Sequence, residues 1–150
     1  MASCNAVGPV HFVHAFRSDA AQIATFLDVP VEFILGLAAE ETTYGTGRIA
    51  TEYNNYFSMH APAPRQKGEA QAQRSAVKVA IYDSFLDSGM SFAMRFGWAV
   101  KGTKTPRDFV NGLIKARFNT NSAKTGGRDG FDTYTIGIIE KVKERMTCPA

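Results

Sequence analysis

The sequence lacks any apolar run long enough to cross a membrane. A spanning helix needs about 20 consecutive apolar residues, and no apolar segment among the 150 residues approaches that length. A secretory leader begins with basic residues ahead of its apolar stretch, whereas the opening segment, MASCNAVGPVHFVHAF, contains no lysine or arginine. We therefore expect a protein that does not insert into the membrane and is made in the cytoplasm without a signal peptide.

Few residues are available for metal, phosphate or cofactor chemistry. His11 and His14 have no acidic partner at the spacing of a zinc motif, and His60 stands alone. The stretch GGRDG lacks the spacing of a phosphate-binding loop. We expect no metal site, no cofactor and no nucleic-acid partner, since the net charge of +3 favours an anionic partner only weakly.

The only two cysteines, Cys4 and Cys148, lie at opposite ends of the chain. Chain termini often lie close together in a folded domain. The two residues would then form a disulfide in an oxidising compartment. Two buried free thiols are the ordinary alternative, and the sequence pattern leaves both states open.

What the chain does contain is a helical pattern between two strong breaks. Its length and its hydrophobic content of 45% fit one globular domain. The breaks are a Pro/Gly/charge loop at 60–69 and a polar glycine-rich region at 120–130. No strand alternation is evident, so we predict a single, mainly α domain with Trp98 in its core. The expected helices are 20–27 with Ser18 or Asp19 as its cap, one that starts near Pro30, and 72–87, 91–98, 106–117 and 132–146.

Two adjacent glutamates lie at the end of the predicted helix PVEFILGLAAEET. With Ile34 as zero and 100° per residue, Glu41 falls at about −20° and Glu40 at about −120°. Glu41 is then in the middle of the apolar stripe and Glu40 on its flank. Burial and the negative end of the helix dipole both disfavour the charged carboxylate, which suits a general acid. The simpler alternative is a helix-end glutamate that reaches water or pairs with an arginine.

The segment TTYGTGRIATEYNNYFSMH follows directly and combines glycine, aromatic and amide residues. Aromatic faces stack on sugar rings, and Asn and Thr side chains hydrogen-bond hydroxyl and N-acetyl groups. Gly45 and Gly47 let the backbone turn sharply. This combination predicts a carbohydrate-binding cleft. For Asn54 and Asn55 the alternative is turn chemistry, in which their amides satisfy the loop backbone.

These residues resemble the core motif of the bacterial glucosaminidases of the lysozyme-like superfamily, Ala-x-Glu-Ser-Gly-Trp-Gly, a short gap, then Asn-Asn-x-Phe-Gly. The stretch from Glu41 to Gly45 matches the first part, and Asn54, Asn55 and Phe57 match the second. This chain has Thr-Thr-Tyr in place of Ser-Gly-Trp and Ser in place of the last Gly. Weaker similarity in VAIYDSFLDSGMSFAMRF and FDTYTIGIIEKV extends the resemblance over residues 19–145. It implies a lysozyme-like single domain, here with a reduced or absent β-lobe.

The resemblance also implies roles for individual residues. Glu41 would be the proton donor to the glycosidic oxygen, and Tyr134, which matches a late tyrosine of the family, would line the same cleft. Glycoside hydrolysis generally uses a second carboxylate, for which the candidates are Glu69 and Asp83, although a substrate's own N-acetyl group replaces it in some families. The expected substrate-binding residues are Tyr44, Asn54, Asn55, Tyr56 and Phe57.

The expected activity is cleavage of the glycan strand of peptidoglycan at the N-acetylglucosaminyl bond. The alternatives are a muramidase or lytic transglycosylase, a phage endolysin, and a non-catalytic wall-binding module. The compact domain without wall-binding repeats is similar to the small glycoside hydrolase effectors of the type VI secretion system. That resemblance implies export by a dedicated secretion system, action in the periplasm of a target cell, and a cognate immunity protein.

Overall fold

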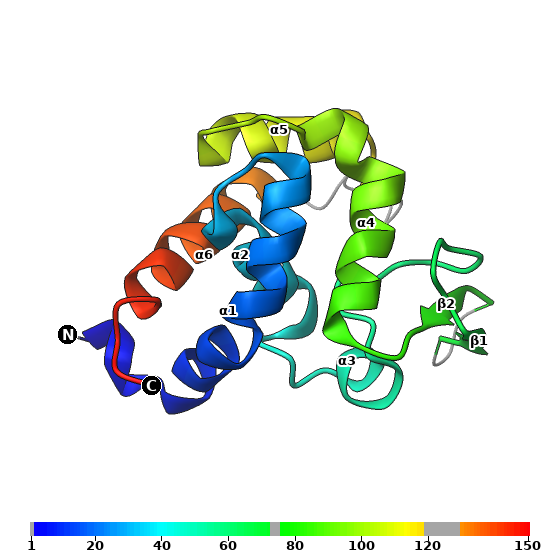
Figure 1. The fold of residues 1–150 in the computed structure, drawn as a ribbon, viewed down its shortest axis with the longest axis horizontal. Coiled ribbons are helices and arrows are strands. Elements are labelled where there is room, and N and C mark those ends of the chain that lie inside the picture. The colour runs from blue at the N-terminus through cyan, green and yellow to red at the C-terminus, as the bar shows by residue number, and fades with distance from the viewer. Residues whose placement is uncertain (1, 73–75, 119–129) are drawn as a thin grey trace.

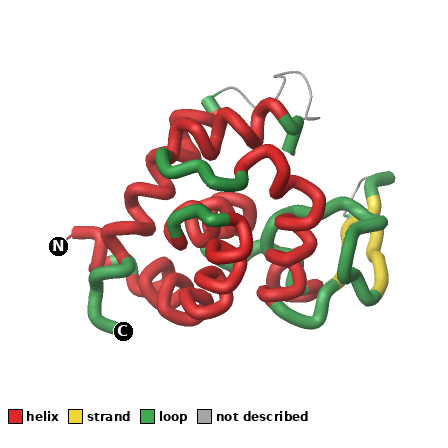
Figure 2. The backbone as a smooth tube through the Cα atoms, turned by 45° about the horizontal axis from the view of Figure 1, so that its top comes forward, coloured by secondary structure: helices red, strands yellow, loops and turns green. Residues whose placement is uncertain are grey.

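The computed structural model describes residues 2–72, 76–118 and 130–150, and most of these residues are helical (Figure 1; Figure 2). Its elements, in chain order, are η1 (Ala2–Asn5), α1 (Val7–Leu27), α2 (Val31–Thr42), α3 (Arg48–Tyr53), β1 (Gly68–Gln71), β2 (Lys78–Ile81), α4 (Phe85–Val100), α5 (Pro106–Lys115) and α6 (Phe131–Arg145). The prediction of a mainly α domain is confirmed. The predicted glycine-rich region lies outside the described residues except for Gly130.

Helix α1 is much longer than the helix predicted at 20–27. Ser18 and Asp19 lie within it, which corrects their prediction as caps. Pro9 is tolerated because it lies in the first turn, where a missing N–H breaks no helical hydrogen bond. Asp28 ends the helix in the left-handed conformation, with φ 58°. The helix buries one long face, made of Val10, Phe12, Val13, Ala20, Ile23, Ala24 and Leu27.

Helix α2 lies inside the domain, against both α1 and α6 (Figure 1). Every residue from Phe33 to Ala39 is buried, so this helix is covered on all sides rather than along one stripe. Gly36 permits the close approach of α6, because a Cβ there would lie 2.7 Å from Cγ1 of Ile139. Glu40 and Glu41 are both half-buried. Helical phase therefore does not separate the two glutamates, contrary to the prediction.

Helices α1 and α2 are the described helices that come nearest to a membrane span in composition. Within the described part of the chain, no single helix combines the required length and apolar character. Only α1 and α2 taken together have the required length and apolar character, and the angle between these two helices is 117°.

The segment predicted as a helix at 72–87 contains strand β2 and the start of α4 instead. The two strands pair antiparallel, with Gly68 opposite Ile81 and Gln71 opposite Lys78. A four-residue strand has too short an apolar run to be distinguished from a helix by periodicity. Ser84 then caps α4, since its hydroxyl accepts a hydrogen bond from the Asp87 amide at 3.1 Å. The prediction left open whether the β-lobe is reduced or absent, and this two-stranded hairpin shows a reduced one.

The last three helices agree better with the predictions. Helix α4 contains the predicted segment 91–98, and α5 and α6 match 106–117 and 132–146 to within two residues at each end. Trp98 is the exception, because it is 68% exposed and not in the core. Gly97 occupies the side of α4 that faces α1, where a Cβ would lie 2.7 Å from Leu27 Cδ2.

The two ends of the chain meet beside α1 and α6 (Figure 1). Cys4 and Cys148 form a disulfide with a Cα–Cα distance of 5.6 Å. Nε2 of His14 lies 2.8 Å from the Cys148 carbonyl oxygen, and Nη1 of Arg17 donates to the Met146 carbonyl at 3.0 Å. Of the two states that the sequence left open, the structure has the disulfide.

Candidate active site

Glu41 lies in the last turn of α2, and a well-ordered turn follows it. The side chain of Thr42 is buried, and its hydroxyl donates to the Ala38 carbonyl at 2.6 Å. The same hydroxyl accepts a hydrogen bond from the Gly45 amide at 2.8 Å. The half-buried carboxylate of Glu41 is therefore attached to a rigid helix end. Such support is what a preorganised catalytic group requires.

The loop after Glu41 turns through three residues with a left-handed backbone. The φ angles are 51° at Thr43, 54° at Tyr44 and 78° at Gly45. Only glycine fits at position 45, because a Cβ there would also lie 3.0 Å from Cδ1 of Phe12. Gly47 has φ −70°, so the turn does not depend on its conformational freedom. Thr43 and Tyr44 adopt this conformation at an energetic cost.

Replacing Thr43 by glycine is expected to stabilise the protein. The left-handed conformation costs a non-glycine residue about 1–2 kcal/mol, and the greater freedom of glycine in the unfolded chain offsets about 0.5–1 kcal/mol. We expect the free energy of unfolding in urea to rise by about 0.5–1 kcal/mol. Thr46→Gly is the control, since Thr46 lies in the same loop without a positive φ. A loss of stability in both variants would contradict the strain at Thr43.

Glu40 faces α6 and not the solvent side of α2. Its Oε1 accepts a hydrogen bond from Oγ1 of Thr135 at 2.6 Å, and Thr135 is fully buried. This bond holds the first half of α6 beside the end of α2, where the neighbouring Tyr134 is 61% exposed. No sequence pattern predicted the contact, because 95 positions separate its two residues.

Tyr44 is held between α1 and the last turn of α6. Its ring meets Phe12 edge-on, with centroids 5.7 Å apart, and its hydroxyl accepts a hydrogen bond from Nη1 of Arg145. Burial raises the pKa of Tyr44, Arg145 opposes this rise, and Tyr134 adds to it. The structure thus shows an electrostatic interaction between two predicted site residues, Tyr44 and Tyr134. It adds Arg145, which no motif in the sequence had indicated.

Asn54 and Asn55 support the backbone around them. Nδ2 of Asn55 donates to the carbonyls of Met59 and Ala80, and its Oδ1 accepts from the Met59 amide, each at 2.9 Å. Asn54 ends α3 with φ 53° and donates to the Tyr82 carbonyl at 3.2 Å. The turn alternative therefore describes both residues. Asn55 is fully buried, so its prediction as a substrate-binding residue is corrected, whereas Asn54 is half-buried.

Replacing Asn55 by alanine is expected to lower the free energy of unfolding by about 3 kcal/mol, because buried backbone groups lose their partners. Asn54→Ala is the neighbouring control. It loses one hydrogen bond at the end of a helix and should cost about 1 kcal/mol. Urea unfolding followed by circular dichroism gives both values. Equal losses in the two variants would contradict a special role for the buried amide.

Tyr56 and Phe57 belong to an aromatic cluster beneath the loop. Phe57 has no exposed surface and Tyr56 is 8% exposed. The Tyr56 ring lies 5.0 Å from Phe16 and from Phe85, and Phe57 stacks on Phe92 at 5.3 Å. Burial raises the pKa of Tyr56. These side chains support the loop from inside. The buried position of Phe57 corrects its prediction as a substrate-binding residue, whereas that of Tyr56, which keeps some exposed surface, stays a prediction.

The two candidates for a second carboxylate lie on or near the hairpin. Glu69 of β1 pairs with Lys78 of β2 at 3.1 Å, and Asp83 pairs with Lys67 at 2.9 Å. The side chains of Glu69 and Asp83 are 41% and 70% exposed. Strand β2 contacts α3, the helix that follows the Glu41 loop. Glu69 is therefore the candidate carried by the β-lobe, and Asp83 lies beyond the end of β2.

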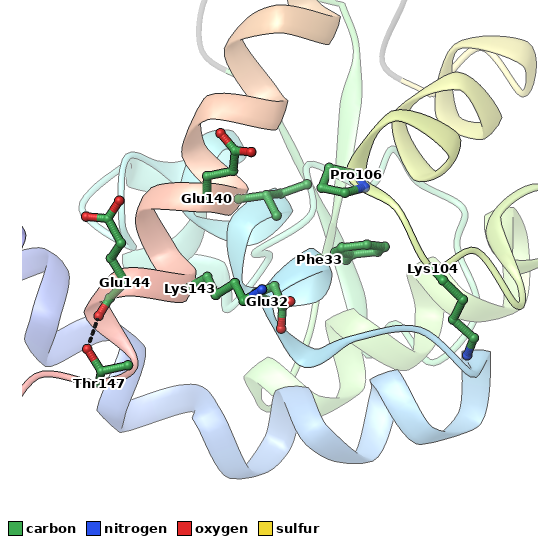
Figure 3. Close-up of a pocket in the computed structure, with 9 residues that line it drawn as sticks. Glu32, Phe33, Lys104, Pro106, Glu140, Lys143, Glu144 and Thr147 are labelled. Carbon is green, nitrogen blue, oxygen red and sulfur yellow. Dashed lines mark hydrogen bonds between the residues drawn. The ribbon is translucent and has the colours of Figure 1, made fainter.

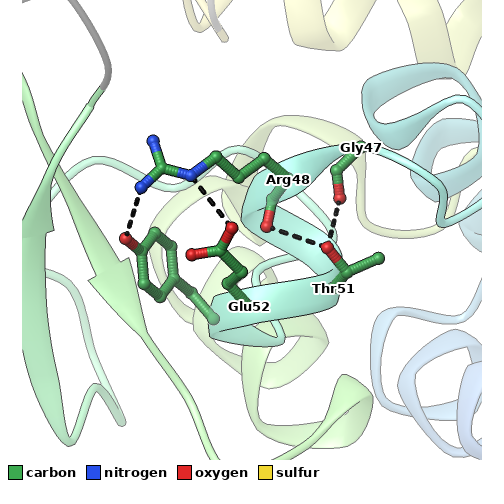
Figure 4. A network of polar contacts seen from close by, with 5 residues as sticks. Gly47, Arg48, Thr51 and Glu52 are labelled. Atoms are coloured by element: carbon green, nitrogen blue, oxygen red, sulfur yellow. Dashed lines mark hydrogen bonds and ion pairs between the residues drawn. The ribbon is translucent and has the colours of Figure 1, made fainter.

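A polar network lies on α3, next to the same loop (Figure 4). Arg48 pairs with Glu52 at 3.0 Å and donates to the Tyr53 hydroxyl at 3.4 Å. The Thr51 hydroxyl donates to the carbonyls of Gly47 and Arg48 at 3.2 and 3.3 Å. An exposed pair of this spacing contributes only about 0.3–0.5 kcal/mol. The network stabilises the surface of α3 and contains none of the predicted site residues.

A groove of about 630 Å³ lies at the other end of α2, away from Glu41 (Figure 3). It carries both signs of charge and none of the predicted site residues, so it is not the predicted cleft. The residues that line this groove are Glu32, Phe33, Lys104, Pro106, Ile139, Glu140, Lys143, Glu144 and Thr147.

In the part of the chain that the structure describes, no group of three or more His, Cys, Asp or Glu side chains is placed to hold a metal ion.

The chain is a mainly α domain with a two-stranded β-lobe and a glutamate in the last turn of its buried helix. Residues 17–144 match the Glucosaminidase profile, described as mannosyl-glycoprotein endo-beta-N-acetylglucosaminidase, and the chain belongs to this family. No curated protein matches the chain.

Several solved structures are similar to this chain. One is a chain of a type VI secretion system effector-immunity complex from Pseudomonas protegens, with 49% identity, a TM-score of 0.89, and coverage of 99% of this chain and 100% of that one. A peptidoglycan hydrolase from Sphingomonas sp. A1 has 22% identity, a TM-score of 0.74, and coverage of 91% and 92%. The glycoside hydrolase domain of Salmonella typhimurium FlgJ has 22% identity, a TM-score of 0.68, and coverage of 92% and 90%. The last two similarities show a shared fold.

Proposed function

We propose that this protein is a peptidoglycan hydrolase that cleaves the glycan strand at the N-acetylglucosaminyl bond, with Glu41 as the general acid. The observation that carries the proposal is the place of Glu41. It lies in the last turn of the buried helix, directly before the loop that contains Tyr44. A glycan strand that contacts both Tyr44 and Tyr134 would present its glycosidic oxygen to the carboxyl group of Glu41. The peptidoglycan hydrolase from Sphingomonas, which shares the fold, supports this substrate.

The reaction needs a proton for the departing oxygen and a nucleophile for the anomeric carbon. Glu41 supplies the proton in the proposed scheme, which is the role of the general acid in glycosidases. For the second role we propose Glu69, because it is the carboxylate carried by the β-lobe. Tyr44, Asn54 and Tyr134 keep exposed surface and are the proposed contacts to sugar.

Analysis of the digestion products tests the proposed bond. Purified peptidoglycan is incubated with the protein, and the new reducing ends are identified by mass spectrometry. N-acetylglucosamine at the reducing ends supports the proposal. N-acetylmuramic acid ends would indicate a muramidase, anhydromuramic ends a lytic transglycosylase, and an absence of cleavage a wall-binding module. Each of these three results would overturn it.

The role of Glu69 is tested by a matched pair of variants. Glu69→Gln and Asp83→Asn each neutralise one carboxylate of an exposed ion pair near the hairpin. If Glu69 is the second carboxylate, only the first variant loses activity, by about 10²-fold or more. Equal, small effects would leave the substrate's N-acetyl group as the nucleophile and would contradict the role of Glu69.

We further infer that the protein is a secreted effector that acts in the periplasm of target cells and is neutralised by a cognate immunity protein. The match to a chain of an effector-immunity complex supports this, because it spans nearly the whole of both chains. The disulfide supports an oxidising site of action. Expression with a periplasmic targeting signal should lyse the cells, and co-expression of the neighbouring gene should prevent lysis. Lysis that persists with Glu41→Gln would contradict an enzymatic effector.

A further inference from the structure

Arg145, in the last turn of α6, connects the start of the chain to the loop after Glu41. Its Nη1 donates to the Tyr44 hydroxyl, and its Cζ lies 5.2 Å from the centroid of the Tyr44 ring. Its Nε donates to the Ser3 carbonyl at 3.1 Å. A guanidinium group is planar and presents its donors in fixed directions. The contact to Ser3 therefore orients the group that holds Tyr44.

Ser3 in turn is held in place by the joined chain ends. It is buried, its hydroxyl donates to Glu144, and it directly precedes Cys4 of the disulfide. Cys148 lies three positions after Arg145, and its carbonyl oxygen contacts His14 of α1. Ser3, which Arg145 binds, and the segment that follows Arg145 are thus both joined to the Cys4–Cys148 disulfide. Opening that bond would release the Ser3 carbonyl from the position in which Arg145 binds it.

We propose that Arg145 is a positioning residue that couples the Cys4–Cys148 disulfide to Tyr44, so that the disulfide-bonded protein cleaves glycan faster than the reduced protein. This inference rests on the proposed function, because it places Tyr44 in the glycan cleft. Arg145 acts through Tyr44 and takes no part in the transfer of the proton from Glu41.

The redox step is an ordinary thiol–disulfide exchange. When the bond forms, the two cysteine thiols lose two protons and pass two electrons to a disulfide oxidant, which leaves as two thiols. A dithiol reductant reverses the step, since it gives two electrons and two protons to the Cys4–Cys148 bond and becomes a disulfide itself. The protein therefore has a more active oxidised form and a less active reduced form.

Variants of Arg145 test the contact itself. Arg145→Met removes the charge and the donors, and we expect kcat/KM on soluble peptidoglycan fragments to fall about tenfold, as small misplacements in a cleft do. Arg145→Lys keeps the charge but lacks the planar fork that holds Ser3 and Tyr44 together, so kcat/KM should fall nearly as far as in Arg145→Met. Arg17→Met is the matched control, because Arg17 also binds the C-terminal segment but does not contact Tyr44. It should leave kcat/KM unchanged.

Nuclear magnetic resonance of tyrosine labelled with ¹³C at Cζ tests the Arg145–Tyr44 contact independently of activity. The Tyr44 signal is assigned by its loss in Tyr44→Phe. Arg145 lowers the pKa of Tyr44, so Arg145→Met should shift the titration of this signal to higher pH. An unchanged titration, or a kcat/KM within twofold of wild type, would overturn the proposal. If the wild type cleaves no glycan, the proposed function fails, but the titration still tests the contact.

A double-mutant cycle tests the coupling to the disulfide. Cys4→Ser with Cys148→Ser is measured at a temperature where circular dichroism shows that the variant is folded, and its kcat/KM should fall about tenfold. Adding Arg145→Met should then cost less than about twofold, because the arginine has already lost its fixed partner. Full additivity of the two losses would show that Arg145 and the disulfide act independently. Reduction of the wild type with dithiothreitol should reproduce the cysteine variant.

Discussion

Replacing Glu41 by glutamine will reduce the rate of glycan cleavage by about 10²- to 10⁴-fold, the usual contribution of a general acid. The amide keeps the shape of the side chain but has no proton to give to the glycosidic oxygen. Stability should remain close to that of the wild type, because the replaced group is only half-buried at a helix end. The release of reducing ends from purified peptidoglycan measures the rate, and thermal unfolding shows that the variant is folded.

Glu40→Gln is the matched control in the same turn of α2. Oε1 of Glu40 accepts a hydrogen bond from Thr135, and the amide oxygen of glutamine can also accept it, although more weakly. This variant should therefore keep most of the activity. If Glu40→Gln were the more damaging change, the acid would be Glu40 and the proposed alignment of the motif would be shifted by one residue.

Removing the disulfide by Cys4→Ser with Cys148→Ser will lower the free energy of unfolding by about 4 kcal/mol, because the bond restricts nearly the whole unfolded chain. The two cysteines are 144 positions apart. For a chain of this size the midpoint of thermal unfolding should fall by roughly 8–16 °C. Differential scanning calorimetry of the oxidised wild type and the variant measures this difference.

Two further measurements accompany this experiment. His14→Ala removes the contact to the Cys148 carbonyl but leaves the bond intact, and it should cost only about 1 kcal/mol. Thiol titration of the unreduced wild type should find no free cysteine. Two free thiols in the purified protein would rule the bridge out.

The helices that could be predicted from the sequence are those with strong local signals. Thr105 and Pro106 start α5 in the way that helix starts prefer, and the Thr105 hydroxyl does accept a hydrogen bond from the Asp108 amide at 3.1 Å. Strand β2 has no such signal, because its four residues form a short apolar run that fits either structure. The true start of α1 was missed because of a misleading local signal. Ser18 and Asp19 resemble helix caps but lie within a continuous helix.

In the candidate site, local sequence is enough to establish which residue types are available and the order in which they follow the helix. A glutamate, a turn glycine and an aromatic residue are local features, and the resemblance to the glucosaminidases rests on their spacing. Gly45 shows why local order was informative here. Its left-handed φ of 78° favours glycine within the turn itself, and the contact with Phe12 of α1 adds a second, long-range reason for glycine.

The packing of the helices, in contrast, sets which of these side chains are exposed and which support the loop from inside. Asn55 and Phe57 belong to the recognised motif, yet both are fully buried. The hydrogen-bond partners of Glu40 and Tyr44 both lie on α6, and they are separated from these residues by 95 and 101 positions in the sequence. The physical reason is that burial and long-range hydrogen bonds depend on how helices pack, and α2 is covered on all sides, so its periodicity carries no record of which neighbour lies where.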